Sequence, residues 1–279
     1  MPSGIVAKGS NKFYETRVFH RQLRVTTTGS AGSAAGVAYA SLPPCRLTHL
    51  KIDSNAAAAA TQDVVIKTDG LSDGSTGTTV FTATNLGTTD IAIRALGQPN
   101  AVDEGRNATG TAGAYTDGLE GGAFIKNGVA VVIAQGDAQT DAVIVDLWFE
   151  TLRLETVTLI AQSGADGAGV VTRTLNLNGA GTLLALKFDF QNTPATADVV
   201  IKDTDTSGTT LFTSTSSQTD FGPAALGIIG VDEANGATAA TDGVAGGQPF
   251  RRGLFFDVAE TDAFTSSNEQ IVIDCWIRQ

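Results

Sequence analysis

The sequence predicts an all-β protein made of two tandem antiparallel β-sandwiches of the jelly-roll type, produced by an internal duplication. First, the phrases DVVIK and GTTVFT within 63–82 return as DVVIK and GTTLFT within 198–213. Second, apolar residues recur at every second position, which is the period of a strand with one buried face. Third, breaks containing Gly, Asp or Asn separate these segments, as in sandwiches built from many short strands.

The repeated phrases keep their order along the chain, and their offsets differ only by the length of the loops between them. VDE at 102–104 returns at 231–233, TDGLEGG at 116–122 returns as TDGVAGG at 241–247, and VIVDLWFE at 143–150 returns as IVIDCWIR at 271–278. A tandem duplication of one module explains this order. We therefore predict an extended N-terminal arm at 1–14, a first sandwich at 15–152 and a second sandwich at 153–279.

Alternating apolar positions predict the strands of the first copy at 15–28, 36–42, 46–54, 63–68, 78–84, 123–134 and 141–151. The second copy supplies the same set from about 154 to the C-terminus, and the one candidate for helix is a single turn near 224–227. The junction at 146–160 contains neither proline nor glycine, whereas a flexible linker is rich in Gly and Ser. The last strand of the first copy is therefore expected to pass almost directly into the second copy and to hold the sandwiches rigidly together.

The net charge of −11 is distributed unevenly. Residues 1–24 carry five basic residues and one acidic residue, a net charge of +4, which leaves about −15 for the rest of the chain. An acidic body repels phosphates, so we expect no nucleic-acid partner. No run approaches the ~20 apolar residues that cross a bilayer, so we expect no membrane partner.

The histidines and cysteines provide no catalytic or metal-binding pattern. His20 and His49 both lie in the first copy, and neither is repeated in the second. They cannot form a Ser-His-Asp or Cys-His arrangement with the residues available. Cys45 and Cys275 occupy non-equivalent places in the two copies, which indicates two reduced thiols and neither a disulfide nor a zinc site.

Paired carboxylates are the remaining catalytic candidates, because a glycosidase needs only two. The repeated VDE places Asp103 beside Glu104 and Asp232 beside Glu233. Adjacent residues of an extended chain point to opposite sides, and the surrounding loops lack aromatic residues that would hold a sugar. We therefore predict that the protein is not an enzyme and needs no cofactor.

One segment resembles part of a calcium-binding loop. Asp203, Asp205 and Ser207 match the first half of an EF-hand loop, but Ser214 stands where that motif has a bidentate Glu. A β-hairpin turn stabilised by an Asp side chain explains the same residues. Calcium binding is the weaker of these two interpretations.

The matched tryptophans are the strongest candidates for an interface. Trp148 and Trp276 occupy equivalent positions and share the outer face of their strands with Asp146 and Asp274. An indole that points away from its own core is expected to contact the other sandwich or another subunit, although a local loop could cover it equally well. The long segments at 102–122 and 231–247 are typical of functional or disordered loops.

At this point the sequence resembles the β-sandwich capsid decoration, or cement, proteins of tailed bacteriophages. The resemblance covers both copies and rests on DVVIK followed by GTTLF, the long Gly/Ala/Thr loop, and GVAVVIAQGDAQTDAVIVDLWFE at 128–150 as a closing strand pair. It implies a non-enzymatic protein, synthesised in the host cytoplasm, that binds the major capsid protein on the outside of the virion. It also implies self-association, as a homotrimer in many such proteins.

The resemblance further implies that an extended terminus clamps neighbouring capsid subunits. By position, that clamp is the arm at 1–14. The arm residues expected to make the contact are the basic Lys8 and Lys12 and the apolar Ile5, Val6 and Phe13.

Two other functions stay open. A double jelly-roll major capsid protein also contains two fused sandwiches, but the close similarity of the copies and the small size favour decoration. A tandem carbohydrate-binding module on a phage tail or spike usually displays several exposed aromatic residues, while this chain has only Trp 2 and Tyr 3.

Overall fold

The structure is a computed structural model. It describes residues 17–27, 35–54, 62–83, 86, 90–96, 105–106, 112–113, 115–116, 122–135, 142–160, 170–191, 197–217, 220–226, 240–241, 247–260 and 270–279. Every regular element among them is a β-strand. None of the described residues belongs to a helix long and apolar enough to cross a membrane.

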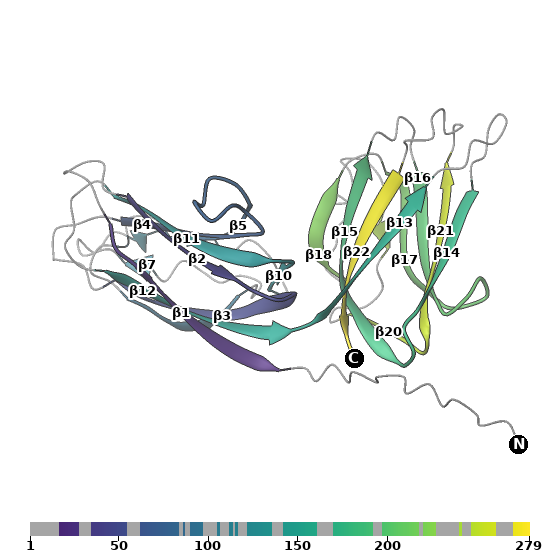
Figure 1. The fold of residues 1–279 in the computed structure, drawn as a ribbon, viewed down its shortest axis with the longest axis horizontal. Coiled ribbons are helices and arrows are strands. Elements are labelled where there is room, and N and C mark those ends of the chain that lie inside the picture. Colours follow the sequence, from purple (N-terminus) through teal and green to yellow (C-terminus); the bar gives the residue numbers. More distant parts are fainter. Residues whose placement is uncertain are drawn as a thin grey trace, which may run out of the picture.

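The first half of the chain forms one sandwich (Figure 1). Its strands are β1 (Val18–Val25), β2 (Ala35–Ser41), β3 (Cys45–Asp53), β4 (Gln62–Thr68), β5 (Thr78–Ala83), β6 (Ile91–Ala95), β7 (Gly105–Arg106), β8 (Ala112–Gly113), β9 (Tyr115–Thr116), β10 (Ala123–Ile125), β11 (Gly128–Gln135) and β12 (Val143–Thr151). One sheet has the order β1-β12-β3, with β10 and β6 both beside β3. The other has the order β2-β11-β4-β5-β9, while β7 pairs with β8.

The second half forms a sandwich of the same topology. Its strands are β13 (Arg153–Ile160), β14 (Val170–Asn176), β15 (Gly181–Gln191), β16 (Ala197–Asp203), β17 (Thr210–Ser217), β18 (Phe221–Ala225), β19 (Ala240–Thr241), β20 (Gln248–Phe250), β21 (Gly253–Glu260) and β22 (Gln270–Arg278). One sheet has the order β13-β22-β15, with β18 and β20 beside β15, and the other has the order β14-β21-β16-β17-β19.

These orders are those of a jelly roll. In each copy the first strand pairs with the last, and the second pairs with the last but one. The chain therefore passes between the two sheets at almost every connection, as two interlocked Greek keys require. All the described pairings are antiparallel, and the predicted all-β fold of two antiparallel sandwiches is confirmed.

Alternating side chains fill a separate core in each sandwich. On β12, Val143, Val145, Leu147 and Phe149 are fully buried, while the residues between them lie on the outer face. The corresponding residues of β22, from Ile271 to Ile277, belong to the second core. This is the period of two on which the sequence prediction was based.

A single residue joins the sandwiches. The strand β12 ends at Thr151 and β13 begins at Arg153, so only Leu152 lies between them. Leu152 is itself buried and belongs to an apolar cluster between the sandwiches. In Figure 1 the strands of the first sandwich run across the view and those of the second run upright.

The structure corrects three details of the sequence analysis. The expected strand at 123–134 is two strands, because a turn at Lys126 and Asn127 sends β10 and β11 into different sheets. The expected closing strand pair at 128–150 is not a pair, since β11 and β12 also lie in different sheets. The region near 224–227 contributes to a strand, β18, whose counterpart β6 was not predicted.

Candidate functional site

The indole of Trp276 lies in the contact between the two sandwiches. Its side chain is 1% exposed and packs with Phe124, Leu152, Leu184 and Ala185. The Trp276 and Phe124 rings have centroids 6.0 Å apart and are tilted by 59°, a favourable arrangement for an aromatic pair. The outer face of β22 therefore acts as a docking surface for the turn that follows β10.

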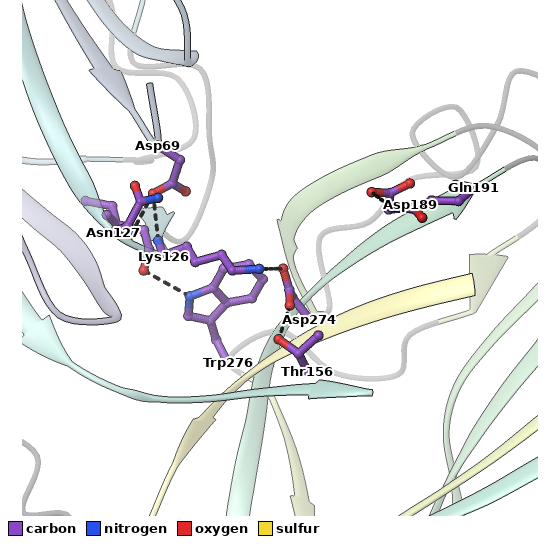
Figure 2. Close-up of polar contacts among 9 residues, drawn as sticks. Asp69, Lys126, Asn127, Thr156, Asp189, Gln191, Asp274 and Trp276 are labelled. Atoms are coloured by element: carbon purple, nitrogen blue, oxygen red, sulfur yellow. Dashed lines mark hydrogen bonds and ion pairs between the residues drawn. The ribbon is translucent and has the colours of Figure 1, made fainter. Parts of the chain in front are cut away.

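The backbone of that turn is held by Asp69. One oxygen of the Asp69 carboxylate accepts the N–H groups of Lys126 and Asn127 at 2.8 and 2.9 Å. The turn in this way presents the Ile125 carbonyl to the second sandwich, where it accepts the indole N–H of Trp276 at 3.2 Å. Figure 2 shows Asp69 on the far side of the turn from the indole.

A charged pair lies beside the indole. The Lys126 ammonium group is 2.9 Å from Oδ2 of Asp274, whose side chain is only 6% exposed. The other oxygen of this carboxylate accepts the hydroxyl of Thr156, which lies opposite Asp274 on β13 (Figure 2). A buried carboxylate is stable only when such partners replace its lost hydration.

A second group of charges joins the sandwiches at Glu150. Its side chain is 8% exposed and lies 2.8 Å from the guanidinium of Arg46, on the adjacent strand β3. Arg278 at the end of β22 binds the other oxygen through two nitrogens, at 2.7 and 2.8 Å. The contact between the sandwiches thus combines an apolar centre with ion pairs on two sides of it.

The second predicted interface residue, Trp148, lies in different surroundings. It is half-buried on the outer face of β12 and does not belong to the apolar cluster around Trp276. His20 on β1 and His49 on β3 are its cross-strand neighbours. The His20 ring centroid is 4.9 Å from the indole, and the His20 imidazole also binds Asp146 at 2.8 Å.

The other predicted sites lie partly outside the described residues. The arm residues Ile5, Val6, Lys8, Lys12 and Phe13 belong to this group. So do the paired carboxylates of 102–104 and 231–233. Cys45 and Cys275 are described, and both are free and fully buried. Burial raises the pKa of the Cys45 thiol to about 12 and also raises the pKa of Cys275, so neither thiol ionises readily.

The three calcium candidates are occupied by turn contacts. Asp203 accepts hydrogen bonds from the backbone N–H and guanidinium of Arg251, at 2.9 and 3.0 Å, and from the hydroxyl of Thr204. Asp205 accepts the N–H and hydroxyl of Ser207 at 2.9 and 2.7 Å. The part of the chain that the structure describes contains no group of three or more His, Cys, Asp or Glu residues placed to hold a metal ion.

The first copy contains the same kind of turn. Asp73 accepts the N–H and hydroxyl of Ser75 at 2.9 and 2.6 Å. This local pattern is an Asx turn, which Asp and Asn form equally well. The hairpin explanation for Asp205 and Ser207 therefore accounts for their contacts in this structure.

Asp203 provides a test of these contacts. Burial would raise the pKa of its carboxyl, but the hydrogen bonds from Arg251 and Thr204 outweigh burial and hold the pKa below its usual value. Asp203→Asn is expected to lower the free energy of unfolding at pH 7 by about 1–2 kcal/mol. The extra stability of the wild type over this variant is fully present above the pKa of about 3.9 that an Asp carboxyl has in the unfolded chain. It is lost as the pH falls through the lowered pKa of Asp203 in the folded protein.

Urea denaturation of both proteins between pH 7 and pH 3 measures this difference. Asp205→Asn is the matched control, because its side chain is exposed and Asn preserves the turn, so its cost should stay within about 0.5 kcal/mol. A constant difference between Asp203→Asn and the wild type across this pH range would contradict the assignment.

Comparison with solved structures finds viral capsid proteins that are similar to this chain only at a low level. No protein-family model and no curated protein match the sequence. Among solved structures, the STIV MCP is 9% identical over 94% of this chain and 96% of its own, with a TM-score of 0.25. PBCV-1 VP54, fitted into a reconstruction of the virophage Sputnik, is 8% identical over 94% and 93%, with a TM-score of 0.26. Infectious bursal disease virus VP2 is 13% identical over 94% and 71%, with a TM-score of 0.17. The jelly-roll assignment therefore rests on the strand order and pairing described above.

Sequence reasoning did not identify Phe124, Lys126, Glu150 and Arg278 as contact residues. Lys126 lies within a segment that was predicted to be one continuous strand, so the turn that presents it was not anticipated. Glu150 and Arg278 occupy equivalent positions with opposite charges, at the ends of VIVDLWFE and IVIDCWIR. That reversal of charge between copies is the signal that could have identified the pair.

Proposed function

We propose that this protein is a non-enzymatic structural component of a virus capsid that reinforces a preformed shell from the outside. The observation that carries this proposal is the pair of jelly rolls joined by Leu152 and fastened by a buried contact. Jelly rolls occur in capsid proteins and also in lectins and cupins, so the fold alone is only an analogy. The rigid joint adds a mechanical property, because two domains held in one orientation can transmit load between their binding surfaces.

The charged groups of the described contact support a structural role. Lys126 binds Asp274, and Glu150 binds both Arg46 and Arg278. These groups neutralise one another inside the molecule. Their arrangement is suited to holding two domains together.

The distribution of charge supports the arm as the fastener. The first 24 residues carry +4 and the rest about −15, so an acidic shell would repel the body and attract the arm. The arm precedes β1, an edge strand that pairs only with β12 among the described strands. An extended segment next to an edge strand can add to an open sheet of a neighbour without a folded domain of its own.

The proposed partners are the major capsid protein and further copies of this chain, with a homotrimer as the expected oligomer. The arm would bind with Lys8 and Lys12 near acidic groups and with Ile5, Val6 and Phe13 in apolar contacts. Screening limits exposed charge contacts beyond about 8–10 Å at ordinary salt, so charge guides the arm while apolar contacts retain it. The proposal therefore assigns the protein to the exterior of the virion.

A shell-forming double jelly-roll major capsid protein is the second candidate. It is favoured by the finding that both halves of the chain have jelly-roll strand order and are joined through the single residue Leu152. A tandem carbohydrate-binding module receives less support. Its best aromatic platform would be Trp148, which is half-buried with its indole packed beside His20.

Deletion of residues 1–14 tests the role of the arm. Both sandwiches stay whole in this variant, so its circular dichroism and unfolding transition should match those of the full chain. Binding to empty particles of the virus that encodes the protein should fall by about tenfold or more, since an interface that loses its anchors loses most of its energy. The particles should then disrupt at a lower temperature than fully decorated ones.

The double variant Lys8→Gln and Lys12→Gln is the matched control. It should slow binding and keep much of the final occupancy, because the apolar residues remain. The role of the arm as fastener would be contradicted if the truncated protein decorated particles as fully as the full chain and made them equally resistant to heat. Closed shells formed by the purified full chain alone, seen by electron microscopy, would favour the major capsid protein instead.

A further inference from the structure

The contact within the chain joins two different parts of the repeated module. The first sandwich contributes the turn at 124–127, which we call the donor turn. The second contributes the outer face of β22 around Trp276, which we call the acceptor face. Because the module is repeated, each sandwich carries both parts. One donor turn, at 249–252, and one acceptor face, around Trp148, make no such contact with each other or with the other described residues.

The unused donor turn shares one backbone hydrogen bond and a preceding glycine with the turn that is docked. The segment QPFRRG at 248–253 is equivalent to AFIKNG at 123–128. Its Arg251 N–H is bound by Asp203 at 2.9 Å, as the Lys126 N–H is bound by Asp69 at 2.8 Å. The preceding glycines, Gly122 and Gly247, both have positive φ, of 87° and 98°. A Cβ there would lie 2.6 or 2.7 Å from a carbonyl oxygen of the neighbouring strand, so both turns need glycine before them.

Three side chains of the unused donor turn are accessible to solvent, while Phe250 belongs to the second core and Nε of Arg251 binds Asp203 at 3.0 Å. Pro249, Arg251 and Arg252 are all exposed, and the Arg251 side chain is 80% exposed. By position, Pro249 corresponds to Phe124, Arg251 to Lys126 and Arg252 to Asn127. This tip therefore carries an apolar ring and two cations where the docked turn carries an aromatic ring and one cation.

The unused acceptor face has matching groups. Asp146 corresponds to Asp274, and in both carboxylates Oδ1 is bound by the cross-strand neighbour, Gln22 or Thr156. Oδ2 of Asp274 binds the incoming Lys126, whereas Oδ2 of Asp146 has no hydrogen bond within the described residues. Likewise, the indole N–H of Trp276 donates to the donor turn, while that of Trp148 has no hydrogen-bond acceptor in the part of the chain that is described.

We propose that copies of this protein associate head to tail, with the 249–252 turn of one chain docked on the Trp148 face of the next. Arg251 then meets Asp146 as Lys126 meets Asp274, and Pro249 packs on the indole of Trp148. The Trp148 N–H reaches the Phe250 carbonyl. This association goes beyond the proposed function, because it requires no shell.

The differences between the two acceptor faces fit a contact that forms after folding. Beside Trp276 the cross-strand neighbours are Leu154 and Ala185, and beside Trp148 they are His20 and His49. A surface that is exposed before association is less prone to aggregation when it carries polar residues in place of aliphatic ones. The contact between chains is therefore weaker than the contact within the chain, and it is heterologous, so it closes into a ring or continues as a filament.

Cross-linking between single-cysteine variants tests this contact. Arg252→Cys and Lys51→Cys lie beside the proposed contact and leave Arg251 and Asp146 in place, because Lys51 is the cross-strand neighbour of Asp146. The two variants are purified separately, mixed at tens of micromolar, and treated with a short bismaleimide. The native cysteines are fully buried and should not react under native conditions. A covalent dimer is expected from the mixture. Addition of Trp148→Ala to the Lys51→Cys chain should reduce its yield about tenfold, as loss of a central tryptophan does in other interfaces.

A mixture of Arg252→Cys with Val37→Cys is the matched control, because Val37 is 41% exposed on β2, in the sheet of the first sandwich that does not contain Trp148. This mixture, and each variant alone, should give little dimer. Equal dimer yields in the control and test mixtures, or no dimer in either, would overturn the proposal. Loss of the cross-link would leave the shell-binding experiment unaffected, so the two proposals fail independently.

Discussion

Replacing Trp276 by alanine is expected to lower the free energy of unfolding by about 3–5 kcal/mol, the usual cost of truncating a buried aromatic side chain. Two effects contribute. The deletion leaves a cavity between Phe124, Leu152 and Leu184, since strands on both sides limit collapse. It also removes the donor that satisfies the Ile125 carbonyl. The substitution weakens the contact between the sandwiches more than either core, so the two sandwiches of the variant should unfold in two separate steps in place of one.

Calorimetry and urea denaturation monitored by circular dichroism would measure both the decrease in the free energy of unfolding and the number of unfolding transitions. Trp148→Ala is the matched control, because the same substitution at the equivalent, half-buried position should cost about 1–2 kcal/mol and leave the transition single. The sequence predicts that both indoles contact the other sandwich or another subunit. Trp276 contacts the other sandwich, so its loss should affect folding, whereas a contact of Trp148 with another subunit stays a prediction. Equal losses for the two variants would contradict this distinction.

Glu150→Gln is expected to cost about 2 kcal/mol, at the lower end of the range for breaking a buried ion pair, because Arg278 is 39% exposed and partly screened by water. The carboxylate is 8% exposed and bridges two guanidinium groups, which repel each other once its charge is gone. The loss should grow at low salt, where repulsion between the arginines is least screened.

A double-mutant cycle with Arg278→Gln isolates the pair. The double variant should be less destabilised than the sum of the single variants by about 1 kcal/mol or more, since removal of Arg278 also removes the repulsion. Glu155→Gln serves as control, because Glu155 pairs with Arg153 on the same strand and both are part-exposed. Its loss should stay below about 1 kcal/mol. Additive losses for Glu150 and Arg278 would show that they act independently, against the geometry.

The period of two and the repeated phrases were sufficient to predict two sandwiches of one topology. Which side of a strand faces its own core is a local property, so the alternation along VIVDLWFE and IVIDCWIR determined the buried residues of β12 and β22. The turns with Asp73 and Asp205 are local as well, because each Asp binds the residue two positions further on. The absence of Pro and Gly from 146–160 similarly predicted the direct passage from β12 to β13.

Only the tertiary structure decided which outer faces meet. Trp148 and Trp276 have nearly the same sequence context, yet one is half-buried beside two histidines and the other is sealed between the sandwiches. The difference arises because the chain has one junction, at Leu152, and its direction brings the 124–127 turn onto β22. The turn itself depends on Asp69, which is 57 residues from Lys126 in sequence and binds its backbone N–H. Contacts between such distant segments depend on the path of the whole chain, which no local pattern encodes.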